Sequence, residues 1–346
     1  MNRRQVTPLV ACLMVGGLSS CAAVEEYART SGSPMMKQLV TDQKEASDRA
    51  AEIGKECKAL EARSITVEEE YAFGGAVGVN WVSQGGGLIQ GLDAHAVHEQ
   101  LNKIGKNLAA QSRRPSLPWT FGVLQSQGVN AVSGPGGYVF LSEGLLARLD
   151  NEAQLAGVLA HEIAHITDKH ALHEYQRFLV SQCKSSMTAE HAKAVLNSAK
   201  QLGLGLPPGD LRNLFQKLTA NVDFNKLGDE AIKAITDGFV QHLSEKGLRE
   251  EDEFTADQEA VELMAAAGYA PWEYVAFLSK LPDSGLSTTH PKKKTRQERL
   301  LAHLKKLNEH AKDDAFSTPV NLSQTKVVPL RDALQARRTG TAAHTN

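Results

Sequence analysis

The chain has 346 residues, of which 42% are hydrophobic and 23% charged, as is ordinary for a globular protein of one large domain or two modest ones. Its formal net charge is −2, which argues against a nucleic-acid partner.

The first twenty residues have the pattern of an export signal. Two arginines precede an apolar run, Pro8 to Leu18, which is too short to cross a bilayer as a helix. The run leads into Ser19-Ser20-Cys21, which resembles a bacterial lipobox. We therefore predict a signal peptide over 1–20 and a lipid anchor at Cys21; a plain signal peptide cleaved at the same small residues is the alternative. Ala22, where inner-membrane retention favours Asp, indicates the outer membrane, facing the periplasm.

The segment after the signal is expected to be helical. Residues 21–65 are polar and alanine-rich, with apolar residues at loosely helical spacing, which predicts a tether and a helix. Residues 66–110 predict further helices, broken at Gly85-Gly86-Gly87; without a following Lys and Ser or Thr these glycines do not indicate a nucleotide site. Cys57 and Cys183 remain in the exported chain, either as a disulfide or as two buried thiols.

A strand-like region comes next. Trp119–Leu124 and Tyr138–Leu141 are two candidate strands, the second preceded by turn residues. Apolar residues at helical spacing then predict helices at 143–148, 151–169, 171–200, 210–219, 227–244 and 248–267. The sequence therefore predicts a mostly helical α+β fold with a small β-sheet.

The motif His161-Glu162-Ile163-Ala164-His165 lies within the predicted helix 151–169. Its two histidines are one turn apart on one helix face, where both imidazoles can bind one Zn²⁺. Glu162 can take a proton from a water that the zinc activates. The alternative is a pair of core histidines satisfied by hydrogen bonds, but burying these side chains in an apolar helix is costly without a metal.

A catalytic zinc needs a third protein ligand. Glu253 and Asp257 share one face of the predicted helix 248–267, so one carboxylate can bind the metal and the other can orient a ligand histidine. A solvated acidic helix start is the alternative, because acidic residues also fill 250–252.

Several blocks over about 66–300 together resemble one family: Ser116–Phe121, Val129–Gly137, Gly144–Leu146, Asn151–His165, His170, Glu253–Asp257, Ala267–Tyr269, and Thr289–Pro291 with Arg296. The chain is similar to the gluzincins that include HtpX and the CAAX prenyl proteases, and in particular to their periplasmic lipoprotein members of the LoiP and BepA type. The resemblance implies a zincin-like metallopeptidase domain with the motif-bearing helix beside the small sheet. We place this domain at 66–305, with a helical insertion at about 174–245 and a polar tail at 306–346.

The resemblance also implies roles for single residues. Glu253 would be the third ligand of one Zn²⁺ per chain, and Asp257 would support a ligand histidine. His290 would stabilise the oxyanion or occupy the open zinc position at rest. Arg296 would polarise the scissile carbonyl or hold an acidic neighbour.

Substrate binding is expected on a strand. Gly136, Gly137, Tyr138 and Val139 resemble the start of an edge strand, running on to Leu141, that pairs with an extended peptide. Ser133-Gly134 departs from the larger apolar pair of many relatives, which puts the local substrate pocket in doubt.

The motif predicts a zinc-dependent endopeptidase. The resemblance and the export signal imply that it cleaves misfolded or unassembled envelope proteins at the periplasmic face of the outer membrane. Its partners would be unfolded or extended polypeptides, the membrane through Cys21, and the outer-membrane assembly machinery. One alternative is a chaperone-like assembly factor with latent protease activity. A structural lipoprotein and a zinc hydrolase with a non-peptide substrate are the others. The insertion is a lid, a docking surface or mere elaboration.

Overall fold

The computed structural model describes residues 26, 29–30, 32, 34–201, 229–281 and 293–311. The chain divides into two compact units. The smaller comprises Met1–Ser64 and Gln176–Asp223, and the larger Ile65–Tyr175 and Phe224–Asn346. Among the described helices, none is long and apolar enough to cross a membrane.

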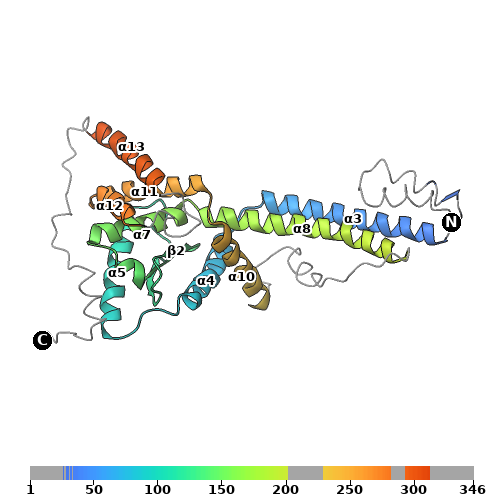
Figure 1. The fold of residues 1–346 in the computed structure, drawn as a ribbon, viewed down its shortest axis with the longest axis horizontal. Coiled ribbons are helices and arrows are strands. Elements are labelled where there is room, and N and C mark those ends of the chain that lie inside the picture. Colours follow the sequence, from blue (N-terminus) through green and yellow to red (C-terminus); the bar gives the residue numbers. More distant parts are fainter. Residues whose placement is uncertain are drawn as a thin grey trace. The chain divides into compact units, whose positions relative to one another are not determined.

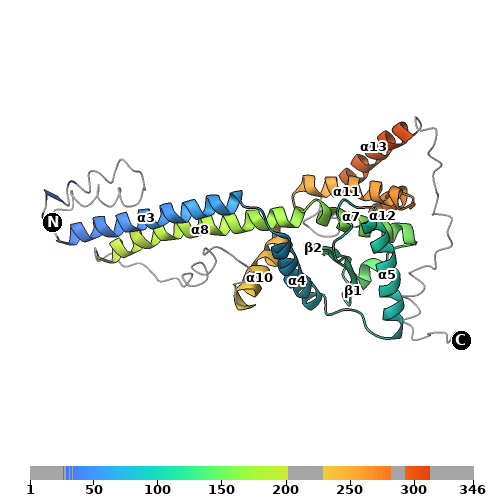
Figure 2. The ribbon, with the colours of Figure 1, turned by 180° about the vertical axis from the view of Figure 1, so that it is seen from behind.

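The smaller unit is built on two helices. Helix α3 (Pro34–Ala62) lies beside α8 (His170–Gln201), most of which belongs to this unit (Figures 1 and 2). A disulfide joins Cys57 to Cys183 with their Cα atoms 5.6 Å apart, which resolves the alternatives left open by the sequence. The side chain of Gln176 donates to the carbonyls at the end of α3, at 3.2 Å for Leu60 and 2.8 Å for Arg63.

The larger unit holds a three-stranded sheet in the order β1-β3-β2. Strand β3 (Tyr138–Ser142) pairs parallel with β1 (Thr120–Leu124) and antiparallel with β2 (Ala131–Gly134). The two predicted strands are therefore confirmed. Strand β2 was not expected, because its few residues lie among glycines and prolines that indicate a turn.

The prediction that Gly136 to Leu141 forms an edge strand is wrong. Strand β3 is the middle strand, so the backbone of Tyr138 and Val139 is flanked by a strand on each side. Gly136 and Gly137 form the turn before it, with φ of 80° and 100°, values that glycine adopts without a steric penalty. Among the described strands, β1 and β2 are the two edges of the sheet.

Helix α7 (Glu152–Thr167) is the buried centre of the larger unit. Helices α5 (Leu92–Ala110), α11 (Glu250–Ala266) and α12 (Trp272–Ser279) pack around it, and β2 lies against it (Figures 1 and 2). Five large apolar side chains of this helix are buried: Leu155, Val158, Leu159, Ile163 and Ile166.

Local contacts fix where α7 begins and how closely α12 approaches it. Asn151 caps the helix by accepting the N–H of Gln154 at 2.9 Å. Gly157 allows the close approach, because a Cβ at that position would lie 2.6 Å from the Cβ of Tyr274.

The remaining described helices of the larger unit are α4 (Val67–Gln84), the short α6 (Glu143–Leu146), α10 (Asp229–Lys246) and α13 (Lys293–Ala311). Helices α4 and α10 pack through an aromatic cluster, in which the ring of Phe73 lies 3.9 Å from that of Tyr175 and 5.2 Å from that of Phe239. Helix α10, from the predicted insertion, is therefore part of the core of this unit. The predicted domain borders stay predictions.

Candidate metal centre

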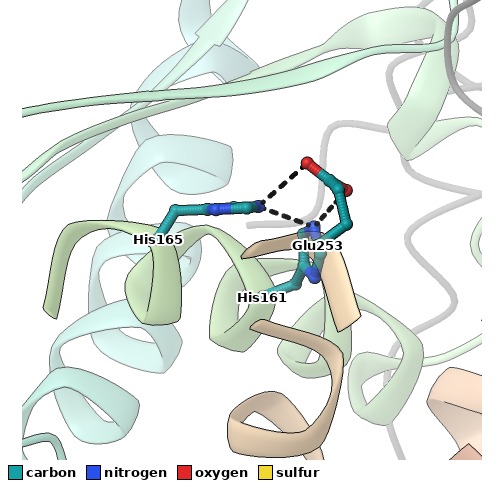
Figure 3. A group of neighbouring side chains, drawn as sticks. All are labelled: His161, His165 and Glu253. Carbon is teal, nitrogen blue, oxygen red and sulfur yellow. Dashed lines mark hydrogen bonds and ion pairs between the residues drawn. The ribbon is translucent and has the colours of Figure 1, made fainter. Parts of the chain in front are cut away.

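Three buried side chains from two helices converge on one point (Figure 3). Helix α7 presents His161 and His165 one turn apart, and the first turn of α11 brings Glu253 against them. The Nε2 atoms of the histidines are 3.1 Å apart. Oε2 of Glu253 lies 3.6 Å from Nε2 of His161, and Oε1 lies 3.5 Å from Nε2 of His165.

These separations fit a metal ion. A tetrahedral ion with bonds of about 2.0–2.1 Å places its ligand atoms about 3.3–3.4 Å apart, close to the three distances observed. Two ring nitrogens that face each other at this distance need either a shared proton or a cation between them, because two lone pairs would repel. Two imidazoles and one carboxylate also match a catalytic zinc site that keeps a fourth position for water.

Behind His161 lies a closed polar network. Oδ1 of Asp257 is 3.0 Å from Nδ1 of His161. Arg296, on α13, donates from Nε and Nη2 to the two oxygens of Asp257 at 2.8 and 2.6 Å. The hydroxyl of Tyr274 donates to Oδ1 of Asp257 at 2.9 Å. All four side chains are buried, so water cannot replace these contacts.

The network sets the charges at the site. Burial alone would raise the pKa of the Asp257 carboxyl, but the Arg296 guanidinium and His161 together outweigh it and hold this pKa well below its usual range. Burial alone would lower the pKa of His161, but hydrogen bonding to Asp257 and Glu253 raises it to about 9. A metal that binds at Nε2 of His161 therefore displaces a proton.

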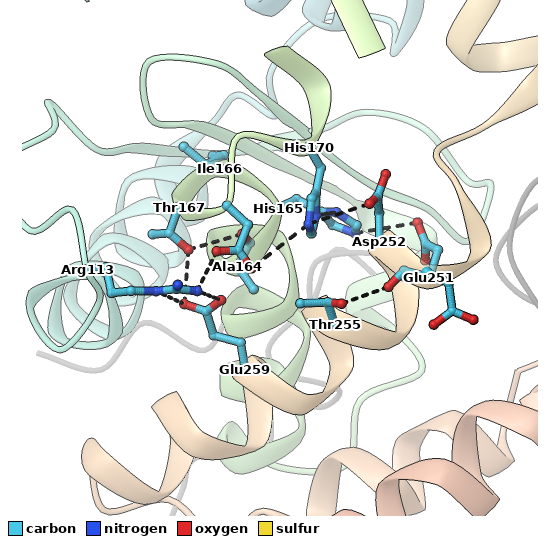
Figure 4. Close-up of polar contacts among 12 residues, drawn as sticks. Arg113, Ala164, His165, Ile166, Thr167, His170, Glu251, Asp252, Thr255 and Glu259 are labelled. Carbon is cyan, nitrogen blue, oxygen red and sulfur yellow. Dashed lines mark hydrogen bonds and ion pairs between the residues drawn. The ribbon is translucent and has the colours of Figure 1, made fainter. Parts of the chain in front are cut away.

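The surroundings of His165 differ (Figure 4). Its Nδ1 lies 2.9 Å from Nδ1 of His170, the first residue of α8. Nε2 of His170 faces Oδ2 of Asp168 at 3.9 Å and Oδ1 of Asp252 at 4.0 Å. Burial lowers the pKa of His170, which favours its neutral ring.

Glu162 follows the first histidine on α7 and is also buried. Within the described part of the chain, its carboxylate forms no hydrogen bond or ion pair with another side chain. Among the described residues, nothing therefore commits this carboxylate to a structural contact.

A cavity adjoins His165 within the larger unit. Ser133, at the edge of the sheet, and Pro135, just after it, line this cavity together with His165, Lys169 and Leu172. The outer edge of β2 and a metal-site histidine therefore border the same space.

A part-buried ion pair holds one wall of this cavity. Arg114 donates from both terminal nitrogens to the carboxylate of Glu70, each at 2.8 Å. Glu70 also accepts the N–H of Gly136 at 3.2 Å, and Arg114 donates to the carbonyl of Ile166 at 3.1 Å. The pair thus connects the turn after β2 with the residue that follows His165.

The structure brings together most of the residues that the sequence singled out. Glu253 lies with the two histidines, Asp257 lies behind His161, and Arg296 contacts the acidic neighbour. His290 and Cys21 lie outside the described residues.

Sequence reasoning missed the contacts of Tyr274 and the approach of His170 to His165. The position of His170, five residues after His165, was the one available signal.

Comparison with known proteins identifies the family. Residues 95–304, more than half of the chain, match Peptidase family M48. The beta-barrel assembly-enhancing protease of Escherichia coli (strain K12) is 24% identical over 196 residues, which cover 56% of this chain and 34% of that protein. The protein of the same name from Yersinia pestis is 38% identical over 82 residues, covering 23% of this chain and 17% of its own.

Another match is the mitochondrial metalloendopeptidase OMA1 of Schizosaccharomyces pombe. It is 36% identical over 77 residues, covering 22% of this chain and 23% of that protein. The match to the Escherichia coli relative thus spans about a third of that protein's length. The resemblance read from the sequence is confirmed: the chain belongs to Peptidase family M48, a family of metal-dependent peptidases.

Proposed function

We propose that this metallopeptidase is a zinc-dependent endopeptidase that cleaves extended polypeptides in the cell envelope. The observation that carries the proposal is the buried group of His161, His165 and Glu253, whose ligand atoms lie within 4.8 Å of one another. Their separations suit a small tetrahedral ion, and the donor set suits zinc that keeps an open position. One Zn²⁺ per chain is expected.

The chain's own residues divide the chemistry between them. When bound, zinc supplies Lewis acidity, which polarises the scissile carbonyl and lowers the pKa of the attacking water to about 7. Glu162 is proposed as the catalytic residue that takes the proton of this water and passes it to the leaving amine. Asp257 orients His161, and Arg296 holds Asp257, so we assign Arg296 a positioning role. The roles proposed for His290 rest on the sequence.

The outer edge of β2, which pairs with no other described strand, is proposed as the substrate-binding edge. Ser142 donates its N–H to the carbonyl of Asn130, so these two residues form a hydrogen-bonded pair. From there along β2, hydrogen-bonded pairs with β3 alternate with pairs that are not hydrogen-bonded. Ala131 and Ser133 then turn their N–H and C=O groups away from β3. An extended peptide can add to this edge by backbone hydrogen bonds, next to the cavity that His165 lines.

Three observations support an envelope location. The N-terminus has an export pattern ending at Cys21, where we propose a lipid anchor in the outer membrane, facing the periplasm. The Cys57–Cys183 disulfide suits an oxidising compartment. Two relatives are named as beta-barrel assembly-enhancing proteases, which supports misfolded or unassembled envelope proteins as substrates and the outer-membrane assembly machinery as a partner.

The proposal is tested by measuring zinc content and casein cleavage side by side in residues 22–346, for wild type and Glu162→Gln. We expect about one zinc in each protein, with kcat about 10²–10⁴-fold lower in the variant, because only the base is lost. Absence of zinc from the wild type would refute the proposal.

A chaperone-like assembly factor with latent protease activity is the second candidate, favoured by the word assembly in the names of the relatives. Zinc in both proteins with cleavage by neither would support it.

A further inference from the structure

The second ring nitrogen of His165 meets an unusual partner. Ligand histidines commonly donate their other ring N–H to a carboxylate, a backbone carbonyl or a water. Here Nδ1 of His165 lies 2.9 Å from a ring nitrogen, Nδ1 of His170, and both side chains are buried.

The direction of this hydrogen bond follows from the proposed metal site, on which the inference rests. Nε2 of His165 faces His161 and Glu253, so a metal there leaves the imidazole proton of His165 on Nδ1. His165 then donates, and Nδ1 of His170 must be an unprotonated acceptor.

The other side of His170 suits this assignment. A neutral imidazole that accepts at Nδ1 carries its proton on Nε2. Nε2 of His170 faces two carboxylates, those of Asp168 and Asp252, at 3.9 and 4.0 Å. Arg249 donates to both oxygens of Asp252, at 3.0 and 2.6 Å, and Arg113 contacts Asp168. The negative charge that favours a proton on Nε2 is therefore held in place.

The backbone brings His170 to this position. Helix α7 ends with the N–H of Asp168 on the carbonyl of Ala164 and that of Lys169 on the carbonyl of Ile166. Lys169 then has φ of 58°, in the left-handed region, and α8 begins at the next residue. The left-handed residue separates the two helices, and the Nδ1–Nδ1 contact of 2.9 Å places the side chain of His170 against that of His165.

We propose that His170 is a positioning residue for the metal: it accepts the Nδ1–H of His165 and thereby fixes the ring orientation and tautomer of that ligand. It does not bind the metal itself. Loss of this acceptor removes the hydrogen bond that orients a buried ligand ring and weakens metal binding.

Substitutions at position 170 separate hydrogen bonding from packing. His170→Asn keeps a polar acceptor near the place of Nδ1, whereas His170→Gln places it near Nε2 and His170→Leu removes it. His242→Leu is the matched control, because it removes a half-buried histidine that contacts Glu174 outside the metal site.

The measurement is zinc retention by residues 22–346 against a chromophoric chelator, with thermal unfolding of each metal-free protein alongside. We expect His170→Leu and His170→Gln to bind zinc about tenfold or more weakly, and His170→Asn and His242→Leu to stay near wild type. Zinc affinity of His170→Leu equal to wild type would overturn the inference. Equal losses of zinc affinity in His170→Asn and His170→Leu would also overturn it, even if only His170→Leu unfolds at a lower temperature than wild type. If the wild type binds no zinc, the proposed function fails instead.

Discussion

The two histidines of the metal centre share one helix and one motif but lie against different surroundings. His161 is backed by a carboxylate that an arginine and a tyrosine hold inside the core. His165 is backed by a second imidazole and borders the cavity that the edge of the sheet also lines. The side of His161 therefore holds buried charges in place, whereas the side of His165 adjoins the path that we propose for substrate.

The largest effect is expected on the side of His161, where the surrounding side chains are buried. Asp257→Asn removes the negative charge that faces His161 and leaves the guanidinium of Arg296 buried without a counterion. We expect zinc affinity to fall about 10–100-fold and the free energy of unfolding to fall by about 3–5 kcal/mol. Chelator competition and urea unfolding measure the two losses.

The control for this variant is Glu262→Gln, because Glu262 contacts His303 at a half-exposed position on the same helix. If Asp257→Asn binds zinc as tightly as this control, the difference between the two histidines is not electrostatic.

A smaller effect is expected on the cavity side. Ser133→Pro removes a backbone N–H that points away from β3, and proline is tolerated at such edge positions. Loss of one hydrogen bond to the substrate, worth about 1 kcal/mol, should raise KM for a peptide several-fold without changing zinc content.

Ser133→Ala keeps the N–H and serves as the matched control. Equal KM values for the proline and alanine variants would show that substrate does not pair with β2.

The smallest effect is expected at the turn that places His170. Lys169 has φ of 58°, so Lys169→Gly relieves a steric cost while it adds freedom to the unfolded chain. The free energy of unfolding should change by less than about 1 kcal/mol, and zinc affinity should not change. Lys169→Val should destabilise the protein clearly, because a β-branched residue rarely adopts this conformation. If urea unfolding gives Lys169→Val the same free energy of unfolding as wild type, the turn does not constrain His170.

Much of the site could be predicted because its spacing is local. In a helix, His161 and His165 share a face whatever the tertiary structure, and so do Glu253 and Asp257. The family resemblance, and not the spacing, indicated that Glu253 is the carboxylate that meets the histidines. No local pattern fixes how two helices pack. The distance of Tyr274 from Asp257 depends on the same packing.

The predictions failed where the structure of a short segment depends on the elements that pack against it. Strand β2 has four residues between turn-forming glycines, so periodicity is too short to reveal it, and β3 was mistaken for the edge. The left-handed conformation of Lys169 has no sequence signal, since lysine seldom adopts it, so periodicity could not reveal the contact between His170 and His165. The disulfide joins residues 126 positions apart, a pairing that spacing alone does not decide.

The most direct test of the metal site is zinc content together with the X-ray absorption spectrum of residues 22–346 loaded with zinc, in wild type and Glu253→Ala. The account predicts one zinc per chain in wild type, bound by two imidazoles and oxygen ligands, and most of it lost from the variant. Sulfur among the ligands, or unchanged coordination when Glu253 is replaced, would contradict it.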